Sequence, residues 1–236
     1  MPKRGVRPVL TPERIVEAAA AVADREGLPG VSMRAVGREL GVEAMSLYHH
    51  VAGKEALLDL LAGWIMERIE PPRPGEGWRD GMRRRSRSAR EVMRAHPWGL
   101  GFVESRRAPN DALLRGHEAV LECLRADGMP VRLAAHAFSV LDAYVYGFVL
   151  TEQYLPFQED GGAEALVAEM ALPADRYPRM TELMREVVVG QDYDYGADEF
   201  EVGLELVLDA LAARLDAERR GGADGPDEPA DGTGGR

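Results

Sequence analysis

Apolar residues recur at helical spacing along most of the chain, and this pattern predicts helices throughout. Between residues 11 and 27 they follow the i, i+3, i+4, i+7 spacing of an amphipathic helix. Thr11 is a good N-cap for this helix, Pro12 suits its first position, and Gly27 marks its end. Because no segment alternates as a strand does, we expect an all-α fold.

Two short helices joined by a tight turn are predicted between Ser32 and Val51. Gly41 separates them, at a point where the backbone must enter the left-handed region. The apolar positions are Met33, Val36, Leu40, Val42, Leu47 and Val51. The helix after the turn, about residues 43–50, leaves five side chains outside this pattern: Met45, Ser46, Tyr48, His49 and His50. One packed face and one face of polar and aromatic tips is the arrangement of a DNA-reading helix-turn-helix.

A proline-rich stretch, residues 71–75, ends the next helix (about 54–69) and is the predicted domain boundary. Beyond it we expect helical segments at about 78–95, 98–104, 110–126, 131–155, 163–189 and 198–219. The chain therefore divides into a flexible basic arm (1–10), a helix-turn-helix domain with its connecting helix (11–70), a helical body (71–220) and a disordered tail (221–236). The tail is rich in Gly, Pro and Asp and has too little apolar surface to fold.

Charge is distributed unevenly between the two predicted domains. The formal net charge is −11, which argues against a protein that coats nucleic acid indiscriminately. Residues 1–54 nevertheless carry eight Lys/Arg against six Asp/Glu, whereas the remainder carries 21 against 34. A mildly basic head on an acidic body is typical of a DNA reader with a separate regulatory domain.

Cysteine content and hydropathy indicate the cellular compartment in which the protein is expected. Cys123 is the only cysteine, so the chain has no intrachain disulfide and no thiolate zinc site. No apolar segment follows the basic N-terminus, and the longest nearly apolar run, residues 56–66, is short of the ~20 residues that cross a membrane. We expect a cytoplasmic protein that is not bound to a membrane.

Several motifs resemble those of the TetR family of bacterial regulators. In the head they are Leu40-Gly41-Val42, Leu47-Tyr48-x-His50-Val51 and Gly53-Lys54-Glu55-Ala56-Leu57-Leu58. In the body, Gly77-Trp78-Arg79, Ala95-His96-Pro97 and Tyr144-x-x-Gly147-Phe148 resemble the tetracycline-repressor branch. The resemblance implies a repressor that a small molecule releases from a palindromic DNA operator. It also implies a homodimer in which the helices at 131–155 and 198–219 form a four-helix bundle with their copies.

The resemblance assigns roles to residues of the head. Arg34 matches an arginine that reads a guanine edge, although a surface ion pair with Glu39 or Glu43 is the alternative. Tyr48, His50 and Lys54 match positions that hold phosphates, and Ser46 matches one that bonds backbone or base. Ala44 departs from the base-reading glutamine of tetracycline repressors, so Met45 and His49 are expected to set a different operator preference. Metal binding by His49 and His50 is disfavoured because adjacent helical residues point about 100° apart.

The family's magnesium–drug site is not expected in the body. Its ligands fall at Val103, Ala143 and Thr151, of which the first two have no donor atom and the third is a poor replacement for a carboxylate. We therefore predict no metal, no cofactor and a mostly apolar effector. Candidate pocket residues are Trp98, Phe102, His117, Phe138, Leu141, Asp142, Val145, Phe148, Tyr177 and Met180. Ordinary core packing is the alternative for each of them.

One charged stripe allows two interpretations. Arg83, Arg87, Arg90 and Arg94 share one face of a helix, and they either pair with acids of the body or bind an anion. Enzymatic activity is not expected, since the chain lacks GxxxxGK, GxSxG and HExxH motifs and Gly99-x-Gly101 has no third glycine. An activator, or a regulator without an effector, remains the alternative within the DNA-binding class, and a helical enzyme or interaction protein is a remote one.

Overall fold

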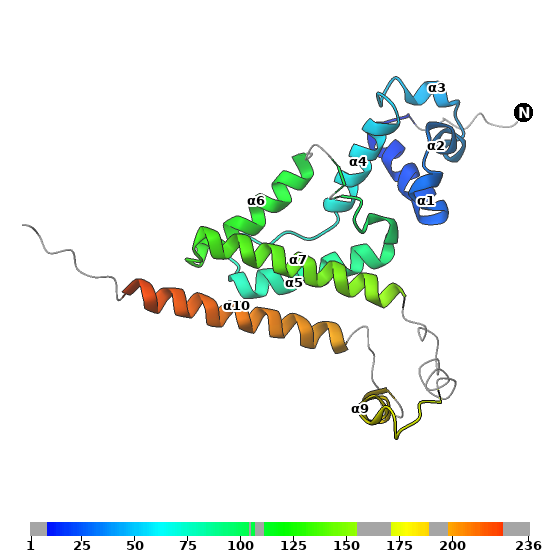
Figure 1. The fold of residues 1–236 in the computed structure, drawn as a ribbon. Coiled ribbons are helices and arrows are strands. Elements are labelled where there is room, and N and C mark those ends of the chain that lie inside the picture. The colour runs from blue at the N-terminus through cyan, green and yellow to red at the C-terminus, as the bar shows by residue number, and fades with distance from the viewer. Residues whose placement is uncertain (1–8, 104, 107–110, 155–170, 189–197, 224–236) are drawn as a thin grey trace, which may run out of the picture.

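The computed structural model describes residues 9–103, 105–106, 111–154, 171–188 and 198–223. Within these ranges the fold is all-α, as predicted, with no strand. The head consists of α1 (Pro12–Gly30), α2 (Met33–Leu40) and α3 (Ala44–Leu47), and α4 (Lys54–Met66) joins it to the body (Figure 1). The body contains α5 (Trp78–Ala95), the 3₁₀ turn η1 (Pro97–Gly99), α6 (Asp111–Ala126), α7 (Val131–Gln153) and α10 (Phe200–Ala223). The predicted arm and tail lie almost wholly outside the described residues.

Helix α1 begins and breaks where its sequence predicts. The Thr11 hydroxyl accepts a hydrogen bond from the Arg14 amide at 3.4 Å, and Pro12 opens the helix. At Gly27 the backbone leaves the helical region with φ 69° and ψ 171°, so the residues from there to Gly30 form a separate turn. The face between these points, which includes Ile15, Ala19 and Val22, is fully buried.

Helices α2 and α3 meet through a turn that depends on two glycines. Ser32 caps α2 by accepting from the Ala35 amide at 3.1 Å, and Gly41 ends it with a left-handed φ of 67°. Gly37 lies where the two helices approach most closely. A Cβ there would lie 2.9 Å from the Val42 carbonyl oxygen and 3.2 Å from the Ala44 nitrogen. The absence of a side chain at Gly37 therefore permits the tight crossing.

Helix α4 packs on both units. Its residues Leu57, Leu61 and Ile65 are fully buried, and the helix contacts α1 in the head and α6 in the body. It ends at Met66, three residues earlier than predicted, although Ile69 remains buried in the following turn. Helix α4 therefore shares buried contacts with both the head and the body.

Helices α5, α7 and α10 lie alongside one another in the body, with α6 against α5 and α7 (Figure 1). The resemblance implies that α10 forms a bundle with a second copy, whereas the main apolar face of α10 packs within its own chain. Its buried residues are Phe200, Leu204, Leu208, Leu211 and Leu215. Helical periodicity of apolar residues shows that a face is buried but does not show what covers it.

Helix α7 is the one described helix long and apolar enough to cross a membrane by length and composition, which the sequence reading overlooked. Core helices of soluble proteins meet the same criterion. Leu133, Leu141 and Val145 of α7 are buried against its neighbours, and Arg85 of α5 forms an ion pair with its Asp142. These contacts fit a core helix of the body.

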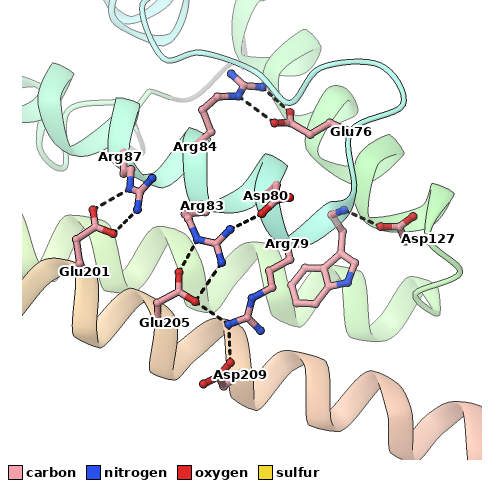
Figure 2. A network of polar contacts seen from close by, with 11 residues as sticks. Glu76, Arg79, Asp80, Arg83, Arg84, Arg87, Asp127, Glu201, Glu205 and Asp209 are labelled. Atoms are coloured by element: carbon pink, nitrogen blue, oxygen red, sulfur yellow. Dashed lines mark hydrogen bonds and ion pairs between the residues drawn. The ribbon is translucent and has the colours of Figure 1, made fainter.

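The arginine stripe of α5 pairs with acids of α10 and α7. Arg83 contacts Glu205 at 2.5 Å, Arg87 contacts Glu201 at 2.6 Å, and Arg79 reaches both Glu205 and Asp209 (Figure 2). Arg90 and Arg94 both contact Glu152 of α7, at 2.7 and 3.4 Å. Of the two interpretations, the structure supports ion pairing within the body.

Candidate nucleic-acid interface and effector region

Helix α3 buries one face and exposes the other. Leu47 and, just beyond the helix, Val51 are almost completely buried against the head. Met45 is 71% exposed and Tyr48 is 49% exposed, while His49 and His50 are also exposed and Ser46 is half-buried. The predicted division into a packed face and an offered face is present in the structure.

The predicted length of α3 is wrong. The helix covers only Ala44–Leu47, rather than residues 43–50. The Leu47 carbonyl accepts hydrogen bonds from the amides of both His50 and Val51, each at 2.9 Å, which closes the helix into a tight turn. Tyr48, His49 and His50 therefore lie on this turn, which Tyr48 enters with helical backbone angles of φ −66° and ψ −16°.

Arg34 and Lys54 extend the exposed polar surface to neighbouring elements. Arg34 is exposed in the first turn of α2, and Lys54 is the first residue of α4. The expected alternative for Arg34 does not occur among the described residues, since Glu39 pairs with Arg25 at 3.0 Å and Arg34 pairs with neither Glu39 nor Glu43.

The whole set offers unused hydrogen-bonding groups. Within the described part of the chain, none of the following side chains makes a hydrogen bond or ion pair: Arg34, Met45, Ser46, Tyr48, His49, His50 and Lys54. Lys54 also opens a helix of 13 residues, whose free amides and dipole favour a phosphate at this end. Cationic, hydroxyl and imidazole groups on one small protruding unit suit contact with a DNA groove and its backbone.

The candidate pocket residues of the body divide into separate groups. Leu141 and Val145 are buried in the core of α7. His117 and Phe138 form an edge-to-face ring contact with centroids 4.8 Å apart. Asp142 is bound by the Arg85 guanidinium at 2.6 Å, so it holds a buried cation within the body. These residues belong to the packed contact of α5, α6 and α7.

Phe148 packs against α10 instead of lining a pocket. Its ring meets Phe200 with centroids 5.2 Å apart, and Arg90 lies over both rings. Tyr177, the N-cap of α9 (Pro178–Leu183), and Met180 within α9 are 42% and 41% exposed. Helix α9 lies with η2 (Met184–Val188) apart from the other body helices in Figure 1. The structure therefore does not bring these two residues into one site with the rest.

Trp98 and Phe102 lie in the body segment after α5 that contacts the head. The Trp98 indole N–H donates to Asp24 of α1 at 2.6 Å, and Phe102 is buried with its ring centroid 6.0 Å from that of Trp98. Asp24 is a functional candidate that sequence reasoning missed, because nothing in its local pattern signals a partner 74 residues away.

An open hollow of about 350 Å³ lies between this segment and α7. Leu100 and Gly101 line one side, and Tyr146, Gly147 and Leu150 line the other. None of the predicted pocket residues lines it, although Leu100 and Gly101 fall between Trp98 and Phe102. Its walls are mainly apolar, and its volume is at the lower end for small-molecule sites.

Comparison with known proteins decides the family. The profile described as "Bacterial regulatory proteins, tetR family" matches residues 15–61, and "Tetracyclin repressor-like, C-terminal domain" matches residues 71–215. The chain belongs to the TetR family. It is a DNA-binding transcriptional regulator and not an enzyme, and the tetR profile covers α2, α3 and most of α4.

Relatives with similar sequences span nearly the whole chain. The HTH-type transcriptional repressor DrrR1 of Streptomyces coeruleorubidus is 37% identical over 231 residues, covering 93% of this chain and 83% of its own. The class D tetracycline repressor protein of Escherichia coli is 28% identical over 211 residues, covering 88% of this chain and 92% of its own. The solved structure of ActR from Streptomyces coelicolor in complex with actinorhodin has a TM-score of 0.72 at 29% identity, covering 88% of this chain and 98% of that one.

The magnesium–drug site of the tetracycline repressors is not supported by the residues of this chain. At the three positions matched to its ligands, Val103 is a buried apolar residue and Ala143 is exposed on α7. The Thr151 hydroxyl donates to the Gly147 carbonyl of its own helix at 2.9 Å. Among the described residues, no group of three His, Cys, Asp or Glu side chains is placed to hold a metal ion.

Proposed function

We propose that the protein is a repressor that binds a pseudo-palindromic operator as a homodimer and is released by a small, mostly apolar molecule. The observation that carries the DNA-binding part is a set of seven side chains between Arg34 and Lys54, of which six are exposed and Ser46 is half-buried. They lie on α2, on α3 with the turn after it, and at the start of α4, and they have no partner among the described residues. Action on chromosomal DNA would place the protein in the cytoplasm.

The outward face of α7 supports dimer formation. Small residues occur there at every fourth position and are all exposed: Ala135, Ser139, Ala143, Gly147 and Thr151. On α10, which packs on α7, Val202 and Leu206 are 57% and 65% exposed. A stripe of small residues permits close approach of a second helix, and exposed Val and Leu supply apolar area for it. We assign α7 and α10 to the interface with a second copy.

The effector is proposed from the body and from relatives. The hollow beside α7 has mainly apolar walls, and a structure of ActR contains actinorhodin while another contains (S)-DNPA. The lack of metal donors at Val103 and Ala143 favours a molecule that binds without a chelated cation. Binding releases DNA only if the molecule has a higher affinity for the conformation in which the heads are misplaced.

The test begins with selection of duplexes from a random DNA pool by the full-length protein. We expect enrichment of an inverted repeat with half-site centres about 34–36 Å apart, or a multiple of it. Light scattering is expected to give twice the 25.9 kDa chain mass. Recovery of no specific duplex, or a stable monomer at micromolar concentration, would contradict the proposal.

A further inference from the structure

One carboxylate oxygen of the head accepts two hydrogen bonds from the body. Asp24 Oδ1 lies 2.7 Å from His96 Nδ1 and 2.6 Å from Trp98 Nε1. Both partners lie at the start of the segment after α5, and this segment contacts α1 directly. A carboxylate is a strong acceptor, and two donors that converge on one oxygen fix its direction as well as its distance.

Aromatic rings surround this contact without supplying another polar link. Trp64 of α4 stacks on Trp98 with centroids 6.2 Å apart and meets His96 edge-on at 4.9 Å. The Trp64 indole N–H is buried and has no partner among the described residues. Ring packing tolerates sliding better than a hydrogen bond does, so Asp24 supplies the directional contact that orients α1 on the body.

The same segment has a second attachment, on α4. Arg106 contacts Asp59 at 2.7 Å and Glu55 at 3.0 Å, and its side chain is largely buried. The eleven residues from His96 to Arg106 thus hold α1 at one end and α4 at the other. Two attachments to different helices restrict rotation of the head, whereas one alone would leave a pivot.

We infer that Asp24 is a positioning residue that sets the separation and relative rotation of the two heads, and hence which half-site spacing the dimer accepts. The inference rests on the proposed dimeric operator binding. Asp24 lies on α1, outside the set of residues proposed to contact DNA. It acts through the position of α1, on which α2 packs, and α2 in turn packs on α3.

Half-site spacing is the direct readout. Inserting one base pair moves a half-site by about 3.4 Å and rotates it by about 35°, so a rigid dimer discriminates strongly against it. The experiment measures affinity for the selected operator and for versions one and two base pairs longer or shorter. It compares the wild type with Asp24→Ala, Asp24→Asn and Glu17→Ala. Glu17 is an exposed carboxylate two turns away on the same helix and provides the matched control.

We expect wild type and Glu17→Ala to lose at least about tenfold in affinity on a change of one base pair, and Asp24→Ala to lose about threefold or less. Asp24→Asn keeps an acceptor oxygen and is expected to resemble wild type. A spacing preference in Asp24→Ala equal to that of Glu17→Ala would overturn the inference, and so would equal loosening in Asp24→Asn.

One further variant and the wild-type selection experiment distinguish failure of this inference from failure of the proposed function. Trp98→Phe removes one of the two donors from the body while leaving the head untouched, and intermediate loosening is expected. Trp98→Phe replaces Asp24→Ala as the test variant if Asp24→Ala does not fold. An unchanged preference for half-site spacing in Trp98→Phe would then contradict the inference. Failure of the wild-type protein to select any duplex would overturn the proposed function instead, because the spacing comparison requires a specific operator.

Discussion

The side chain of Asp127 caps a helix that begins 49 residues earlier in the chain. Its carboxylate accepts a hydrogen bond from the Trp78 backbone amide at 2.6 Å, at the first residue of α5 (Figure 2). The neighbouring N-cap position, Gly77, has no side chain to perform this task. The turn after α6 therefore holds the start of α5 in place.

Asp127→Ala is expected to lower the free energy of unfolding by about 1 kcal/mol, the usual cost of removing an N-cap. Urea denaturation at fixed protein concentration measures this change, since a dimer's stability depends on concentration. Asp127→Asn keeps an acceptor oxygen and is expected to retain most of the stability. Equal losses in the two variants would indicate that charge, not the cap, is responsible.

The stability of the body is expected to fall in acid through Glu205. Hydrogen bonds from Arg83 and then Arg79 lower the pKa of Glu205 from 4.5 to about 2. A folded pKa below the unfolded one contributes stability that is complete above about pH 4.5 and is lost as the pH falls toward 2. Because Glu205 is partly exposed, the contribution is at most about 1 kcal/mol.

Glu205→Gln tests this expectation by unfolding at pH 7 and pH 3. We expect the variant to be less stable than wild type at pH 7 and the difference to shrink at pH 3. Glu118→Gln, an exposed acid on α6, is the control and is expected to follow wild type at both values. A constant difference between Glu205→Gln and wild type across this range would refute the assignment.

Gly37→Ala is expected to disrupt the helix-turn-helix. The added Cβ would lie 2.9 Å from the Val42 carbonyl oxygen, so α2 and α3 must separate at a cost of about 1–3 kcal/mol, with loss of DNA binding. Gly116→Ala is a matched substitution within α6, where a new Cβ meets nothing within 4 Å. It is expected to be neutral or stabilising in thermal unfolding, because alanine favours helices over glycine.

Arg34→Ala is expected to weaken binding to the selected operator by about 1–3 kcal/mol and to relax preference at one base pair. The physical reason is loss of a guanidinium that can bond two acceptors of one guanine edge. Competition binding with single-base operator variants measures the preference. If base preference is unchanged, Arg34 is a phosphate contact or a surface charge.

Lys54→Ala is expected to behave differently from Arg34→Ala. Removal of a phosphate contact weakens binding to all sequences alike and reduces the slope of log K against log salt by about 1. Binding to operator and to unrelated DNA across a salt series measures both quantities. An unchanged slope would show that the ammonium of Lys54 does not reach a phosphate.

The head was predictable because its determinants are local. The Ser32 cap, the left-handed Gly41 and the burial of Leu47 and Val51 all follow from residues within a few positions of one another. The length of α3 was not predictable from local residues, since the hydrogen bonds to the Leu47 carbonyl that end the helix depend on the turn that follows. Helical spacing continues through Tyr48 in the sequence although the helix has ended.

For the body, the sequence predicts which helix faces make contacts but not which residues they contact. The stripe beginning at Arg83 was evident, but Glu205 lies 122 residues further along and only the packing of α10 on α5 brings them together. Trp98 was assigned to a pocket because an aromatic residue at inward spacing fits either a cavity or a contact between units. The distinction depends on Asp24, whose own sequence surroundings are those of an ordinary exposed acid.

The pairing of α5 with α10 makes ionic strength act on this protein in two places. Salt reduces the free energy of counterion release at phosphates, and it also screens the partly exposed carboxylates of Glu201 and Glu205 that hold α10. If α10 forms part of the dimer interface, concentrated salt weakens the packing of α10 that supports this interface. The same salt lowers the affinity of the heads for DNA. In a salt titration of operator binding by the intact dimer, the slope of log K against log salt is then steeper than the number of phosphate contacts alone predicts.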